Sequence, residues 1–207
     1  MTIRTLTRRA ALLAVTATAS LALAACGGGD GAARAGHGGQ ASPSASATAG
    51  AHNAQDVSFA QGMIPHHQQA LEMAKLADGR ASSARVKDLA ARIEKAQDPE
   101  IRTMTGWLTA WGEQVPMAGM DHSGHSGMTG MAGMMSDDDM AALKKATGAD
   151  FDSRFLSLMV EHHRGAVEMA GTEKTKGAYG PARTMAGDIV RAQNAEIQEM
   201  ERLLGGS

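Results

Sequence analysis

Two pairs of adjacent histidines stand out in the sequence, His66-His67 and His162-His163. A methionine precedes each pair in the pattern Met-x-x-His, where iron-binding helical bundles carry Glu-x-x-His. Imidazole nitrogen together with thioether sulfur favours copper, with silver as a soft surrogate, and makes iron less favourable. The spacing therefore predicts a copper site. The candidate ligands from these two segments are Met63, His66, His67, Met73, Met159, His162, His163 and Met169.

The two segments are copies of one another. Moving His66 onto His162, a shift of 96 positions, aligns residues 56–74 with 152–170 and residues 90–104 with 186–200 without a gap. Such an alignment indicates an internal duplication. In each copy the apolar residues recur every three or four positions along two stretches, which is the spacing of one helical face. Two duplicated helical hairpins predict an all-α fold, an antiparallel four-helix bundle.

Polar residues interrupt the apolar face of the second helix in each copy. They are Gln97 and Glu100 in the first copy and Gln193 and Glu196 in the second. A buried carboxylate is costly unless a histidine or a cation lies beside it. We therefore expect Glu100 and Glu196 to face the histidines as candidate ligands. Gln97 and Gln193 are expected to orient the imidazoles.

Several residues are expected to shape the helix ends. Asp78-Gly79 and residues 177–181 carry turn-forming residues, and Gly205 is expected to close the last helix. Pro65 and Pro99 fall inside helical segments and are expected to kink them. Ser136 is expected to cap a short extra helix that stops at Gly148.

A methionine-rich and glycine-rich connector, residues 113–135, separates the two copies. Such a loop has no core to fill, and thioethers in solvent invite oxidation. A flexible chain can wrap several thioethers around Cu(I) or Ag(I), so the connector predicts a second, looser soft-metal site. A low-complexity linker and a loop that docks on the bundle remain alternatives. Its candidate ligands are Met117, Met120, His122, His125, Met128, Met131, Met134 and Met135.

The N-terminal segment indicates export. Three arginines precede an apolar run that is too short for a permanent membrane span, so residues 1–25 are predicted to be a signal peptide. The run ends in Leu-Ala-Ala-Cys26, which resembles a bacterial lipobox and predicts lipidation of Cys26. A secreted chain with an incidental cysteine is the alternative. Residues 26–52 are rich in glycine, alanine and serine and predict a flexible tether, ahead of a folded domain over residues 53–207.

Charge and cysteine content exclude other classes. Without the three signal-peptide arginines, Lys plus Arg falls from 20 to 17 against 22 acidic residues, a formal charge of −5. Nucleic-acid binding requires a basic face, so no nucleic-acid partner is expected. The single cysteine permits no intramolecular disulfide, and a metal site must use His, Met and carboxylates.

The duplicated segments 59–74 and 155–170 resemble the signature of the domain of unknown function 305 (DUF305) family. Residues 97–104 and 193–200 are similar to that family as well, as is the stretch 148–152. The resemblance implies a ferritin-like four-helix bundle, usually exported and often lipid-anchored. Some members are copper-binding proteins tied to metal tolerance, which the resemblance extends to the histidine pairs and their methionines.

These observations predict an exported copper-binding protein that is not an enzyme. It would be lipid-anchored to the outer face of the cytoplasmic membrane and would buffer, sequester or transfer the metal. A ferritin-like metal-dependent oxidoreductase and a metal-free structural or interaction bundle are the alternatives. Homo-oligomerisation and a metal-transfer partner are left open by the sequence.

Overall fold

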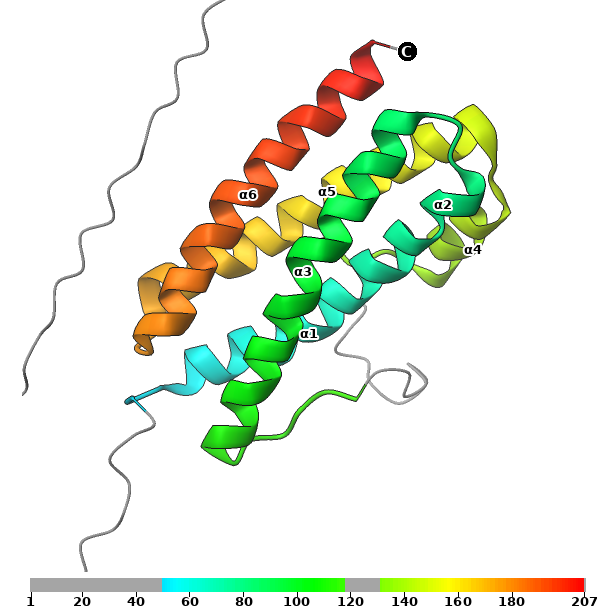
Figure 1. Ribbon diagram of the computed structural model, residues 1–207. Coiled ribbons are helices and arrows are strands. Elements are labelled where there is room, and N and C mark those ends of the chain that lie inside the picture. Colours follow the sequence, from blue (N-terminus) through cyan, green and yellow to red (C-terminus); the bar gives the residue numbers. More distant parts are fainter. Residues whose placement is uncertain (1–49, 118–130, 207) are drawn as a thin grey trace, which may run out of the picture. The chain divides into compact units, whose positions relative to one another are not determined.

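Each stretch with a helical repeat of apolar residues forms a helix in the computed structural model, which describes residues 50–117 and 131–206. The four long helices are α1 (Ala54–Lys75), α3 (Ala84–Trp111), α5 (Gly148–Lys176) and α6 (Gly180–Gly205) (Figure 1). Two short helices are α2 (Ala77–Arg80) and α4 (Asp137–Lys145). In the described ranges the one β-type contact is an isolated bridge between Ala81 and Gly148. The predicted all-α bundle is confirmed.

The duplication is visible as two antiparallel hairpins (Figure 1). In the first, α1 packs on α3; in the second, α5 packs on α6; and the hairpins meet along α1 and α5. An ion pair of 2.7 Å between Arg92 and Glu199 also joins α3 to α6. Because the first helices of the two copies pack on one another, their equivalent faces are brought together.

The helix ends follow local sequence signals. Asn53 caps α1 and Ser136 caps α4, each in a capping box with the aspartate three residues later. The short helix predicted from Ser136 is present. The expected turn at Asp78-Gly79 is the short helix α2, and Gly206 rather than Gly205 caps α6.

Both prolines lie inside helices that remain continuous. Pro65 lies within α1 and Pro99 within α3. None of the helices described over residues 50–117 and 131–206 has the length and apolar character needed to cross a bilayer.

Some predictions fall on residues 1–49 and 118–130, outside the described ranges. They are the signal peptide, most of the tether, the lipidated Cys26, and the connector residues Met120, His122, His125 and Met128. These remain predictions.

Candidate metal centre

The histidines of both pairs point into the bundle. All four have a relative exposure of 0%. The rings of His66 on α1 and His162 on α5 lie with their centroids 3.8 Å apart, at an interplanar angle of 42°. These two residues occupy the same position in the two copies. The duplication thus places two equivalent imidazoles next to one another in the interior.

The central imidazoles are neutral and lack normal hydrogen bonds. Neither ring nitrogen of His66 or of His162 has a hydrogen-bond partner among the described residues. Burial, reinforced by the neighbouring His67, lowers the pKa of His66 to about 3. Burial and the proximity of His66 likewise lower the pKa of His162 well below its usual value. Metal binding requires neutral imidazole with a free lone pair, and this pair supplies both.

The second histidine of each pair is held by a glutamate from the other helix of its hairpin. His67 Nε2 lies 2.8 Å from Glu100 Oε2, and His163 Nε2 lies 2.7 Å from Glu196 Oε2. Each glutamate keeps partial solvent contact, with side-chain exposures of 24% and 18%. The carboxylates can fix the tautomer and orientation of His67 and His163, leaving their Nδ1 atoms available as ligands.

Gln97 and Gln193 accompany these pairs in the interior. Both are 3% exposed, and the Oε1 atom of each has no hydrogen-bond partner in the described part of the chain. As the sequence predicts, they lie on the buried face, one turn before the glutamates.

Methionine side chains flank the histidines. Met63 and Met159, one turn before the central imidazoles, are completely buried, and so is Met73. Met169, the counterpart of Met73, is only partly buried. Over the described ranges, His, Cys, Asp and Glu side chains do not form any group of three or more suited to a metal ion.

The end of the connector crosses α5 next to the central pair, so this part of the connector docks on the bundle. A Cβ atom on Gly165 would collide with the carbonyl of Ala132, and one on Gly133 would lie 2.8 Å from the carbonyl oxygen of His162. The backbone of Ala132 also lies close enough to His66 to favour its protonated form, against the larger effect of burial. We call residues 131–135 the strap.

Gln69 fixes the end of the strap from α1. Its Nε2 donates to the carbonyl of Met135 at 3.0 Å, and its Oε1 accepts from the backbone N–H of Met135 at 2.8 Å. Gln69 and Gly165 occupy equivalent positions in the two copies. The Gln69 side chain holds Met135 by two hydrogen bonds, whereas Gly165 has no side chain and lets the strap pass close to its backbone. This mismatch between the copies is the sequence signal that could have revealed the strap.

The remaining connector methionines differ in exposure. Met131, Met134 and Met135 in the strap are partly buried, whereas Met117 is 64% exposed.

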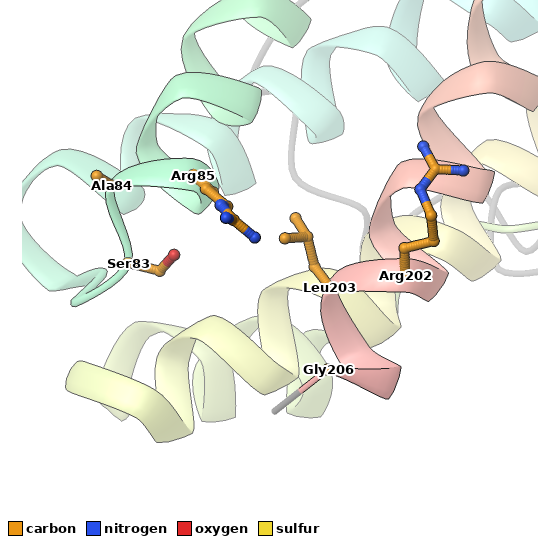
Figure 2. A pocket seen from close by; sticks show the side chains of 6 residues that line it. All are labelled: Ser83, Ala84, Arg85, Arg202, Leu203 and Gly206. Carbon is orange, nitrogen blue, oxygen red and sulfur yellow. The ribbon is translucent and has the colours of Figure 1, made fainter.

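A separate hollow of about 430 Å³ lies between the start of α3 and the end of α6 (Figure 2). There Arg85 and Leu203 extend toward one another, and none of the described residues that line the hollow is a histidine or a methionine. It has no part in the metal centre.

The chain is similar to a known protein family and to several solved structures. The family model of the domain of unknown function DUF305 matches residues 56–204. The structure of CopM in its Cu(I)-bound form is 33% identical, with a TM-score of 0.60, covering 73% of this chain and 96% of that one. CopM has also been solved with Cu(II) and with silver. A search among curated proteins gave no match.

Two further solved structures are similar. A DUF305 fragment from Deinococcus radiodurans is 32% identical with a TM-score of 0.66, covering 75% of this chain and 98% of that one. A DUF305 protein from Streptomyces coelicolor, described as secreted, is 32% identical with a TM-score of 0.65, covering 73% and 93%.

Proposed function

The chain belongs to the DUF305 family, and from that premise we propose that it binds copper as a cargo, with His66 and His162 at the centre of the site. One observation carries the proposal: two fully buried, neutral imidazoles 3.8 Å apart whose nitrogens have no hydrogen-bond partner in the described ranges. Buried polar groups are normally paired, and an unpaired group costs free energy. A bound cation would satisfy these nitrogens.

The donor set favours the monovalent ion. Cu(I) is a soft ion that accepts imidazole and thioether ligands, and Ag(I) shares this preference. Met63 and Met159 stand one turn from the central rings on the same buried faces. His67 and His163, oriented by Glu100 and Glu196, are the next donors. The capture of both copper and silver by CopM, a third identical, supports this assignment.

We further propose that the protein holds or transfers copper and performs no catalysis with it. The ligands have no exposed surface, so a second reactant would have to displace the packed core to reach the metal. The role that fits is buffering, sequestration or transfer outside the cytoplasm, with Cys26 as the lipid anchor. The secreted relative supports export, and the lipobox-like sequence supports the anchor.

The proposal is tested by competition for Cu(I) against a coloured chelator, using the full mature protein. Substitution His66→Ala together with His162→Ala should weaken binding at the tightest site by about a hundredfold or more, since loss of a mere supporting group costs about 10–100-fold. His52→Ala is the matched control, because His52 stacks on Trp111 rather than facing the other histidines. Equal affinity of the double variant and the unaltered protein would overturn the core site, provided that both show the same helical content.

A further inference from the structure

The duplication breaks at a place close to the buried histidines. Gly62 on α1 corresponds to Leu158 on α5, and the partly buried Met169 corresponds to the fully buried Met73. In the second copy Leu158 packs against the core. In the first copy the missing side chain leaves space on the surface of α1, and Met169 turns toward that space.

Two thioethers from different segments occupy this space. A Cβ atom built on Gly62 would lie 3.5 Å from the sulfur of Met131 on the strap and 3.8 Å from the sulfur of Met169 on α5. Both sulfurs thus lie within 4 Å of one point, although the residues are far apart in the sequence. They line a hollow of about 310 Å³ together with Glu168, whose carboxylate favours a cation.

The hollow reaches the strap where the strap meets the metal centre. Ala132 lines the hollow, and its backbone lies beside the imidazole of His66. Met131 is the preceding residue, and Gly62 lies one turn before His66 on α1. An ion held by the two sulfurs would therefore lie close to the buried pair while keeping access to solvent.

We propose that Met131 and Met169 form an outer binding site for a monovalent soft ion, separate from the buried imidazoles. Two thioethers suit Cu(I) or Ag(I), whereas harder ions gain little from them. The inference rests on the proposed function because it places a second binding site for copper beside the core site. It differs from loose capture by the connector, since both sulfurs are held on the folded bundle.

Titration of the full mature protein with Ag(I), followed by NMR of isotope-labelled methionine methyl groups and histidine rings, tests the proposal. The methyl signals of Met131 and Met169 should shift together, while that of Met185 on α6 should remain unchanged. Gly62→Leu, which installs the residue of the second copy, should abolish the paired shift and leave the histidine response intact. Met131→Leu with Met169→Leu should remove one bound Ag(I) per chain.

The two hypotheses fail in different ways. If the histidine signals respond but the Met131 and Met169 methyl groups do not, the outer site is wrong and the core site stands. If these methyl groups respond and the histidine rings do not, the outer site stands and the core site fails. An unchanged paired shift in Gly62→Leu would also overturn the outer site, because the sulfurs would then be binding without the hollow.

Discussion

The imidazoles of His66 and His162 lie 3.8 Å apart, centroid to centroid, in the middle of the bundle. Each belongs to the first helix of its copy, so an internal duplication has produced a paired site from a single repeated residue. Because both rings are buried, a proton on one is unfavourable for the other. The unloaded protein is thereby sensitive to acid.

We expect the apo protein to lose stability as the pH falls from 6.5 toward 3. The pKa of His66 is lowered from 6.5 to about 3 in the folded state. Between these pH values the unfolded chain binds a proton at His66 and the folded chain does not. The contribution is fully present above pH 6.5 and is lost as pH falls through the folded pKa. For this one residue the loss amounts to about 5 kcal/mol. Denaturant unfolding at a series of pH values measures it, and His66→Leu should flatten the profile; an equal slope in both proteins would contradict the account.

The glutamates paired with His67 and His163 should tune metal affinity. Glu100→Gln removes the carboxylate that orients His67, and we expect Cu(I) affinity to fall by about 10–100-fold. Glu196→Gln should have a similar effect on the other copy. Glu72→Gln is the control, since Glu72 is an exposed member of an ion pair with Lys144. Competition titration of the three variants measures the effect, and identical affinities would show that the carboxylates serve packing alone.

The fold and the inward orientation of the histidines could be predicted because both follow from periodicity. Apolar spacing assigns His66 to a buried helical face, and the constant shift between copies assigns His162 to the same place in the other half. The pairings of His67 with Glu100 and of His163 with Glu196 follow from hairpin packing. Local pattern and duplication together determine these relationships.

The strap could not be predicted in the same way. Whether a glycine-rich segment docks depends on a surface made by other parts of the chain, here the bare backbone at Gly165 and the clamp at Gln69. Gly165 by itself looks like a weak position in a helix. The burial of Glu173 was not predicted either, because it depends on how the end of α5 packs against the start of α1.

Gly165 should therefore be intolerant of a side chain. Gly165→Ala would push a methyl group into the carbonyl of Ala132, and we expect either loss of about 1–3 kcal/mol or release of the strap from α5. Gly171→Ala, in the same helix with open space around the added methyl, should instead stabilise the protein by about 0.5–1 kcal/mol. Chemical denaturation gives the free energies, and hydrogen exchange of Met135 reports release. Matching effects of the two substitutions would exclude a tight crossing at Gly165.

The buried carboxyl of Glu173 should make the bundle less stable in alkaline solution. Burial and the neighbouring Asp56 raise the pKa of Glu173 from 4.5 to about 7. Burial alone would raise the pKa of Asp56 too, but backbone N–H groups of Asn53, Tyr179 and Ala178 outweigh it and lower that pKa. Asp56 is thus the charged member of the pair, and Glu173 holds the proton. Its contribution to stability is fully present below pH 4.5 and is lost as pH rises through about 7.

Glu173→Gln keeps a hydrogen-bond donor toward Asp56 that does not titrate. The variant should match the unaltered protein at about pH 4.5 and exceed its free energy of unfolding by about 3 kcal/mol at about pH 8. Glu168→Gln, an exposed position on the same helix, should show no such divergence. Unfolding curves of the metal-free proteins at both pH values provide the measurement. A stability difference that stays constant between these pH values would mean that folding does not raise the pKa of Glu173.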